Sequence, residues 1–303
     1  MNSSWFQEYR HHISLHAIIF IWGFTGILGK LIEVPFYSIV WYRMSLAAIG
    51  LLAYFIMAKK KFETDPKKIV KFILVGMIVA GHWSAFFQAI KVSNVSVVLT
   101  TLASTSLFVA FLEPLLYKRK IIAYEVVFGV IVIIGLSLIF NFESQYQLGI
   151  LLALLASILA AIFGTVNGVL VRDSAAGQIT FWEMIGGVIG ISLYTYFFEN
   201  PTITDFSPSM LDIFYLLILG WICTALAFVV SVQVTKYLSP FTVSISINME
   251  PIYAIILALI FFGDSEKMTP GFYLGAVLIL GTVLGNGLMK RLKKSKKLSN
   301  EKG

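Results

Sequence analysis

Gln88-Ala89-Ile90-Lys91 returns 145 residues later as Gln233-Val234-Thr235-Lys236, and this correspondence decides the fold. A second correspondence precedes it in both halves, because Tyr42-Arg43-Met44 matches Trp182-Glu183-Met184 at an offset of 140. A third consists of two glycines in each half, Gly129 and Gly135 against Gly275 and Gly281. The order is the same in both halves, and the small changes of offset fall in loops. The second half of the chain is therefore predicted to be a diverged copy of the first.

The composition is that of a membrane protein. Of the 303 residues, 58% are hydrophobic and only 13% are charged, whereas soluble domains carry about 25% charged residues. Runs of about 20 apolar residues, each long enough to cross a hydrocarbon core of roughly 30 Å as a helix, recur ten times. These runs fall at 13–31, 37–58, 69–90, 94–117, 121–141, 147–171, 178–198, 210–235, 241–262 and 270–290.

Each copy holds five of these spans. Because five is an odd number, the second copy must enter the bilayer upside down, and inverted repeats are typical of secondary transporters. We therefore expect an all-α integral membrane protein of ten transmembrane helices, built as two inverted five-helix repeats around a central cavity. The first repeat covers 1–143, the second covers 144–291, and a basic cytoplasmic tail follows at 292–303.

The charge distribution predicts the orientation. Of the 23 lysines and arginines, all but four fall on the same side as the N-terminus. The exceptions are Lys30, Lys91 and Lys267 on the opposite side and Arg43 within a span. Basic residues collect on the cytoplasmic side of membrane proteins, so both termini are expected in the cytoplasm, with the chain in a bacterial inner membrane. The net charge of +7 then reflects topology and contact with anionic lipid rather than nucleic acid.

Targeting and cysteine content add two expectations. The polar N-terminal segment leads into a full-length span without a small-residue cleavage site, so the first span is expected to remain uncleaved. The single cysteine, Cys223, excludes an intramolecular disulfide.

Glu250 is the strongest candidate for binding a substrate or a proton. An ionisable group within a span is costly, which makes each one a functional candidate. Pro251 follows it and removes a backbone hydrogen bond, and a broken helix beside a carboxylate is a recurrent transporter site. The alternative is a protonated carboxyl that bonds a neighbouring helix. Ser246 and Tyr253 share the helical face of Glu250, and Asn248 lies off that face.

Other polar and aromatic residues fall at similar depth. Thr105 is the repeat equivalent of Glu250, with Thr101 one turn earlier; hydroxyls of this kind also bond back to their own helix. His82 can donate, accept or titrate near neutral pH, or can simply satisfy an interhelical hydrogen bond. The tryptophans expected as walls of the cavity are Trp22, Trp83 and Trp221.

Arg43 and Glu183 are repeat equivalents at opposite depths, as inversion predicts. Arg43 is a candidate for clamping a substrate carboxylate through two hydrogen bonds, for snorkelling towards the membrane surface, or for locking a gate. Glu183 is a candidate gate residue or a carboxylate used in helix packing. The four histidines are not spaced as a metal site, so no metal is expected.

The sequence resembles the EamA family of the drug/metabolite transporter superfamily. The first half matches at Trp22-Gly23, at Tyr42-Arg43 and from Phe86 to Lys91, and the second half matches at Glu250-Pro251 and at the turn Phe262-Gly263-Asp264-Ser265-Glu266. The resemblance implies a central cavity that takes amino acids, nucleobases or other small metabolites. Two departures are Ser106, where a mid-helix proline is expected, and Lys118-Arg119-Lys120, which replaces an acidic turn.

These observations favour a secondary transporter that exports a small metabolite, an amino acid or a related compound, without a cofactor. Protons are a candidate coupling ion through Glu250 or His82. No motif of an intramembrane enzyme or of an ATP-driven pump is present, so the chain is not expected to be an enzyme. A lipid carrier or a non-transporting membrane protein is the alternative. Close glycine pairs, Gly186 with Gly190 and Gly281 with Gly285, suit helix packing within the monomer or in a homodimer.

Overall fold

The computed structural model describes residues 3–118, 123–239, 243, 246–247, 249–282, 285 and 289, and the regular elements within these residues are helices. The basic tail at 292–303 lies outside the described residues. In chain order the elements are α1 (Ser3–Leu31), α2 (Phe36–Met57), α3 (Pro66–Val92), α4 (Val95–Leu102), α5 (Thr105–Tyr117), α6 (Ala123–Phe142), η1 (Ser144–Tyr146), α7 (Gln147–Leu170), α8 (Ala176–Phe198), η2 (Ile203–Phe206), α9 (Met210–Leu217), η3 (Ile218–Leu226), α10 (Ala227–Val234), α12 (Glu250–Phe262), η4 (Gly263–Glu266) and a last helix at Pro270–Thr282.

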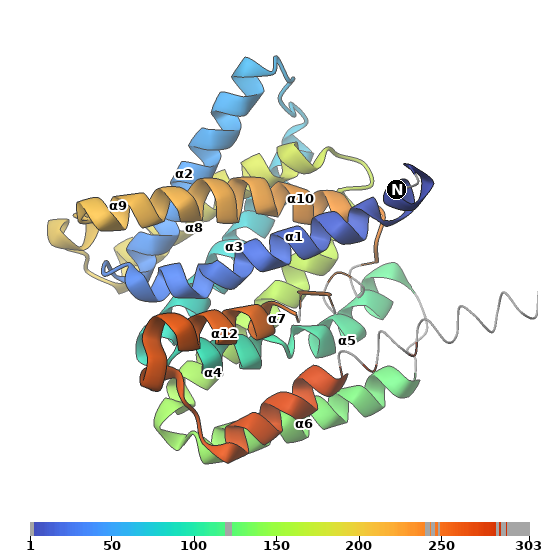
Figure 1. The fold of residues 1–303 in the computed structure, drawn as a ribbon. Helices are drawn as coiled ribbons and strands as arrows, with labels where there is room; N and C mark the ends of the chain where they lie inside the picture. The colour runs from blue at the N-terminus through green and yellow to red at the C-terminus, as the bar shows by residue number, and fades with distance from the viewer. Residues whose placement is uncertain are drawn as a thin grey trace, which may run out of the picture.

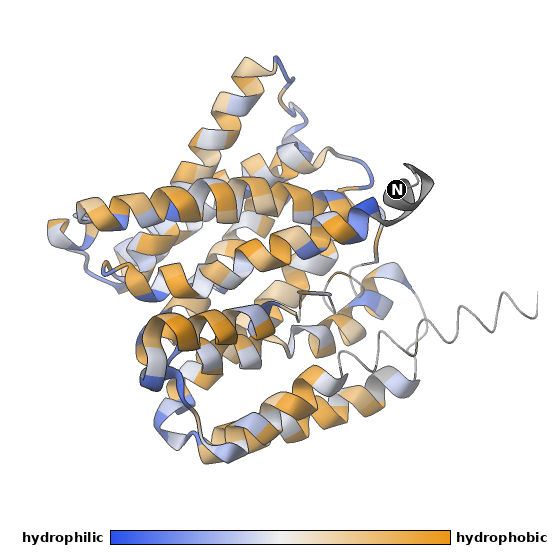
Figure 2. Cartoon of the chain, in the orientation of Figure 1, coloured by the Kyte–Doolittle hydropathy of each residue, from blue (hydrophilic) through white to orange (hydrophobic). Residues whose placement is uncertain are grey.

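Seven helical stretches are long and apolar enough to cross a membrane. They are Arg10–Leu31, Phe36–Met57, Pro66–Val92, Val95–Tyr117, Ser144–Leu170, Ala176–Phe198 and Met210–Val234. Over the described residues, Val127–Phe142, Glu250–Phe262 and Pro270–Thr282 are shorter apolar helices. Figure 2 shows hydrophobic residues along most of each helix and hydrophilic residues gathered in the connecting loops. The chain is therefore a multi-pass membrane protein, as the composition predicted.

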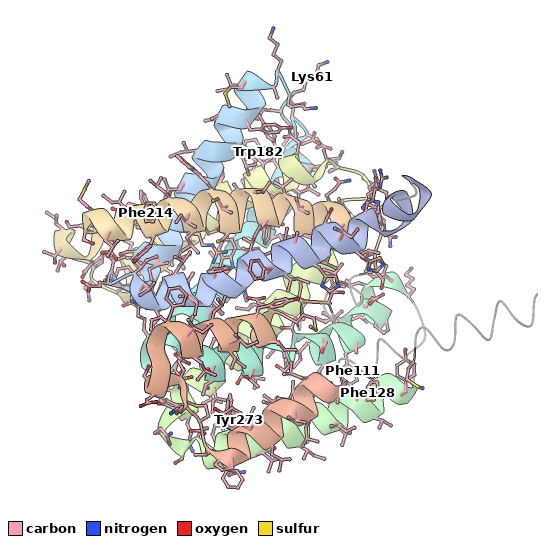
Figure 3. The ribbon with its side chains drawn as sticks, viewed as in Figure 1. Lys61, Phe111, Phe128, Trp182, Phe214 and Tyr273 are labelled. Carbon is pink, nitrogen blue, oxygen red and sulfur yellow. The ribbon has the colours of Figure 1, made fainter. Side chains whose placement is uncertain are left out.

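The surface of the bundle carries large apolar side chains. Phe214 and Tyr273 point away from it (Figure 3), and both are exposed. Trp221 is 47% exposed, and its Nε1 donates to the carbonyl of Leu46 at 3.1 Å. The expectation that Trp221 forms a cavity wall is therefore wrong, since its side chain lies on the outer surface of the bundle.

Helix α3 packs between α7 and α8 in the main core. The approach to α8 is close enough that only glycine fits: a Cβ built on Gly186 would lie 2.2 Å from the carbonyl oxygen of Ile73, and one built on Gly76 would lie 2.1 Å from the carbonyl oxygen of Glu183. Small residues permit such backbone contact between membrane helices. The packing of α3 on α8 therefore depends on glycines from both helices.

The pair formed by α6 and Pro270–Thr282 lies at one edge of the bundle (Figure 1) and packs through a small apolar cluster that also includes Val97, Leu107 and Ile150 of neighbouring helices. Gly135 and Gly275, each of which has a glycine counterpart in the other half, face each other here. A Cβ built on Gly135 would lie 2.9 Å from the carbonyl oxygen of Gly275. The matching glycines thus bring these two helices into close contact.

Two of the predicted spans are interrupted. The span predicted at 94–117 is broken between α4 and α5, where the hydroxyls of Thr105 and Ser106 donate to the carbonyls of Leu102 (2.7 Å) and Ala103 (3.1 Å). The span predicted at 210–235 contains the π-helix η3, in which the Thr224 hydroxyl donates to the Leu219 carbonyl at 2.6 Å. Stretches of π-helix are often found at functional sites.

A buried carboxylate joins the end of α1 to the start of α4. Glu266, 1% exposed, accepts hydrogen bonds from the backbone N–H and hydroxyl of Ser96 at 2.9 and 2.8 Å, and it pairs with Lys30 at 2.8 Å. The N-terminus of a helix favours a negative charge, which explains why the carboxylate lies there. This arrangement, the Glu266 cluster, consists of Lys30, Val95, Ser96 and Glu266.

Candidate functional site

A cavity of about 130 Å³ lies within the bundle, lined from α1, α2, α3, α5, α7, α10 and α12 among others. About 10–15 Å³ of such volume accommodates one water molecule, so the cavity has room for a small metabolite. Of the residues singled out from the sequence, six line it: Trp22, Arg43, His82, Trp83, Thr105 and Glu250. These residues come from both halves of the chain, and the fold brings them together.

Arg43 lies on α2 and is only 2% exposed. Its Nε donates to the hydroxyl of Thr224 at 2.6 Å, and its guanidinium carbon lies 3.8 Å from the centre of the Trp83 ring. Stacking of this kind stabilises a cation that water does not reach. The Nη1 atom is buried and has no hydrogen-bond partner. Arg43 therefore does not snorkel, and it has a donor available for a ligand in the cavity.

The π-helix explains how Thr224 reaches Arg43. The Thr224 hydroxyl donates to the Leu219 carbonyl, five residues earlier, and accepts from Arg43 Nε. One hydroxyl thus satisfies a carbonyl of the widened helix and fixes the guanidinium. The irregular segment of the span positions the buried cation.

Glu250 begins α12, and Pro251 takes the first turn, where a missing backbone N–H costs nothing. The carboxylate is 7% exposed and lines the cavity. It interacts electrostatically with Arg43, but the described contacts include no direct ion pair between the two side chains. The helix N-terminus adds a partial positive charge beside the carboxylate. An acidic and a basic side chain thus face the same cavity without direct contact.

His82 and Trp22 are each held by a backbone carbonyl. His82 Nδ1 lies 2.8 Å from the carbonyl oxygen of Ala156, so Nδ1 carries a hydrogen and donates it. Trp22 Nε1 donates to the carbonyl of Cys223 at 3.0 Å. Both side chains are therefore fixed in orientation by a neighbouring helix while they line the cavity.

The remaining walls are largely aromatic. Phe228 lies between Trp83 and Phe163, with ring centres 5.7 and 5.9 Å away. Phe163 also meets His82 edge-on at 5.3 Å. Aromatic rings at these separations attract one another and form a rigid apolar surface. The cavity therefore combines two opposite charges with an aromatic wall.

The model of the EamA-like transporter family matches this chain twice, over residues 12–141 and 147–288. The chain belongs to this family. An uncharacterized transporter of Haemophilus influenzae is 23% identical over 265 residues, with 82% of this chain and 84% of that protein covered. The uncharacterized transporter YxxF of Bacillus subtilis is 22% identical over 270 residues, covering 86% and 83%. A crystal structure that shares 12% identity matches with a TM-score of 0.69 over 93% of this chain and 99% of that chain, which supports the fold.

Several residues singled out from the sequence lie elsewhere in this EamA-like transporter. Thr101 is buried beside α7, where its carbonyl accepts from Ser157. The Tyr253 ring packs against Phe20 at 5.7 Å, outside the cavity lining. Ser246 does not line the cavity, and Asn248 lies outside the described residues. Glu183, on α8, is buried with its backbone against α3 and its side chain near Asn167 of α7, and it makes no ion pair with Arg43 among the described contacts.

Sequence reasoning missed two kinds of lining residue. Asn167 is the one amide side chain of α7 after its first residue, Gln147, a signal that the sequence did offer. Phe163 and Phe228 had no such signal, because phenylalanine is common throughout the chain. Within the described residues no group of three metal-ligating side chains occurs.

Proposed function

We propose that this chain is a secondary transporter that exports a zwitterionic small metabolite, an amino acid with an apolar or aromatic side chain. The observation that carries the proposal is the placement of Arg43 and Glu250 in one cavity without direct contact. Breaking a buried charge pair is costly when one partner is left unpaired. An amino acid placed between them supplies a carboxylate for Arg43 Nη1 and an ammonium group for Glu250, so every buried charge then has a partner.

The aromatic wall suggests the side chain of the substrate. Phe163 and Phe228 line the cavity beside Trp83 and offer apolar surface rather than hydrogen bonds. Burying apolar area contributes about 25 cal/mol per Å², so a phenylalanine or leucine side chain gains more here than an alanine side chain. The charged groups then fix the orientation of the substrate, and the aromatic wall selects its size.

Ten spans in two inverted repeats with alternating access form part of this proposal. Thr105 and Glu250, separated by the same 145 residues as the sequence repeat, are the first residues of α5 and α12. The two matches of the family model, one in each half, give further support. In such folds the repeats rock around a central site that opens to each side in turn.

The proposed direction follows from the predicted topology. With both termini in the cytoplasm, Lys59–Lys61 and the end of α10 lie on the cytoplasmic side, and the Glu266 cluster lies on the outer side. The cavity lining includes Thr235 and Val243, which then face the cytoplasm, while the Glu266 cluster ties the helices together at the opposite end. This state is suited to loading from the cytoplasm.

Transport in proteoliposomes with three related probes tests the proposal. The probes are L-phenylalanine, phenethylamine, which lacks the carboxylate, and phenylpropionate, which lacks the ammonium group. We expect only L-phenylalanine to exchange rapidly in the wild type. Arg43→Gln and Glu250→Gln should each reduce that exchange at least tenfold, because each leaves one end of the zwitterion unpaired. Glu33→Gln, at an exposed position, is the matched control and should exchange like the wild type.

Three results contradict the proposal. If both charge variants exchange L-phenylalanine like the wild type, the two charges do not bind it. If either truncated probe competes as well as L-phenylalanine, the substrate is not a zwitterion. If a labelled phospholipid crosses the bilayer while no water-soluble probe does, the chain is a lipid carrier. Efflux from preloaded cells that express the wild type then tests the direction.

A further inference from the structure

Glu183 is a buried carboxyl that the proposed substrate site does not use. It lies on α8 (its neighbour Trp182 is labelled in Figure 3) and is 0% exposed. On the α3 side its own backbone carbonyl faces Gly76, where even a methyl group would collide at 2.1 Å. The side chain is therefore enclosed at a helix contact that excludes solvent.

Neither oxygen of the Glu183 carboxyl has a hydrogen-bond partner. The Asn167 amide of α7 lies near the carboxyl and interacts with it, and the Oδ1 atom of Asn167 is likewise buried without a partner. The buried oxygens of Glu183 and Asn167 thus all lack a donor, and a hydrogen on the Glu183 carboxyl would supply one. A protonated Glu183 can donate that hydrogen to Asn167 Oδ1, whereas an ionised one cannot.

No cation faces Glu183 from the helices packed against it. Helices α7 and α10 contain no acidic, basic or histidine side chain, and α8 contains no other. On α2 the charged group is Arg43, which donates to Thr224 and stacks on Trp83. On α3, His82 donates to Ala156, and the lysines lie towards the two ends of the helix at Lys67, Lys68, Lys71 and Lys91. An ionised carboxylate here is uncompensated, which is strongly unfavourable in a protein interior.

We propose that Glu183 is the proton-binding site of this transporter, holding a proton while α3 and α8 are packed together and releasing it through Asn167 to the cavity when these helices separate. Asn167 lines the cavity, so it connects the buried carboxyl to the space that water and substrate enter. On release the carboxyl O–H bond breaks, a water molecule in the opened cavity accepts the proton, and Glu183 becomes a carboxylate.

Glu250 and His82, the two candidates for proton binding that line the cavity, already have other interactions. Glu250 has Arg43 as an electrostatic partner and serves the substrate ammonium group in the proposed function. His82 donates through Nδ1 to a backbone carbonyl, and the positive charge of Arg43 opposes a second positive charge on the imidazole ring. The proton site inferred here is thus separate from the substrate charges, which allows proton and substrate to be bound at the same time. Its role in energy coupling rests on the proposed transport function, whereas protonation itself does not.

Infrared spectroscopy of the purified protein at neutral pH tests protonation without any substrate. A protonated carboxyl has a C=O stretch that is distinct from those of carboxylates and amides. We expect the difference between the wild-type and Glu183→Gln spectra to contain this band. The spectrum of Glu250→Gln, the matched control, should retain the band. Asn167→Ala should shift the band to higher frequency, because the carboxyl loses its acceptor. A difference spectrum without the band overturns the proposal.

Transport then tests the coupling. With L-phenylalanine as the probe, Glu183→Gln should exchange it like the wild type. The accumulation of L-phenylalanine that a pH gradient drives should be at least tenfold lower in this variant than in the wild type. Gradient-driven accumulation equal to that of the wild type overturns the coupling role. If the wild type does not transport L-phenylalanine, the substrate assignment fails, while the infrared result still decides whether Glu183 binds a proton. Glu183→Asp, which keeps a carboxyl, should retain the infrared band and so serves as a second variant.

Discussion

Replacing Glu266 with Gln is expected to loosen the end of the bundle where α1, α4 and η4 meet. The carboxylate accepts from Lys30, from the backbone N–H groups of Val95 and Ser96, and from the Ser96 hydroxyl. In the proposed alternating-access cycle this end must open for the substrate to leave. The Glu266 cluster therefore holds the outer end closed, and weakening it should favour the outward-open state.

The size of the effect follows from the number of donors. A glutamine side chain has one acceptor oxygen, and its amide would face either the Lys30 ammonium or the donors of Ser96. At least one charge-assisted hydrogen bond is lost, which costs about 1.5–3 kcal/mol. Because about 1.4 kcal/mol is a factor of ten in an equilibrium constant, the outward-open population should rise roughly 10- to 150-fold.

Cysteine accessibility measures this population. Cys223 is the one cysteine of the chain, so Cys223→Ser provides a clean background for Thr25→Cys. Thr25 lines the cavity from α1 and is buried, and cysteine is close to threonine in size. The rate of labelling by a membrane-impermeant maleimide added from the outside should rise in Glu266→Gln by the same roughly 10- to 150-fold, because only the outward-open state reacts.

Asp264→Asn is the matched control, since it removes a carboxylate from the same turn. Asp264 pairs with Lys267 at 2.6 Å, and the side chains are 90% and 69% exposed. Exposed pairs contribute little because water and salt screen them, so labelling should match the Thr25→Cys parent. If Glu266→Gln also labels like the parent, or if both variants rise equally, the reasoning about the buried cluster is refuted.

Three further predictions concern packing and the cavity. Gly76→Ala should lower the free energy of unfolding by at least about 2 kcal/mol, because its Cβ would lie 2.1 Å from a backbone oxygen of α8. Thermal unfolding in detergent measures this loss. Gly164→Ala is the control that should not lose stability, because a Cβ at this position meets no atom within 4 Å. Thr224→Val removes the hydroxyl that holds the buried guanidinium of Arg43 and should reduce L-phenylalanine exchange about tenfold. Thr224→Ser keeps a hydroxyl and should exchange like the wild type. Equal exchange by the wild type and both variants contradicts this prediction. Phe228→Ala should weaken competition by L-phenylalanine several-fold and leave competition by L-alanine unchanged, since only the larger side chain reaches the aromatic wall; an equal loss for both amino acids points to a general disruption.

The seven helical stretches that are long and apolar enough to cross a membrane, and the start of a helix at Glu250, could be predicted because their signals are local. A membrane helix must satisfy its own backbone in lipid, so its apolar residues are contiguous in the sequence, and Pro251 marks an interruption by itself. The break between α4 and α5 has no such mark. Ser106 stands where the family has a proline, and the hydroxyls of Thr105 and Ser106 bond back to the preceding turn instead. Serine and threonine make such bonds in many uninterrupted helices, so their presence alone predicts no break.

Partners far apart in the sequence could not be predicted. The depth of Arg43 follows from its position in a span, but its acceptor Thr224 lies 181 residues away and depends on a π-helix that leaves no composition signal. For Glu266 the sequence indicates only that it belongs to a short turn that resembles one in the family. Its partner Ser96 is 170 residues away in the sequence. A single sequence gives the depth of each polar group but not the neighbour that satisfies it.

The matching starts of α5 and α12 show how unequal halves can produce one oriented site. Thr105 and Glu250 occupy matching positions at the start of α5 and α12 and both line the cavity, but one offers a hydroxyl and the other a carboxylate. Arg43 and Glu183 also match, yet only Arg43 lines the cavity. The cavity thus has a cation contributed by the first half and an anion contributed by the second. A fully symmetric pair of halves would present the same charges from both sides and could bind a zwitterion in two opposite orientations. Divergence at these positions leaves one favourable orientation, with the carboxylate towards α2 and the ammonium group towards α12.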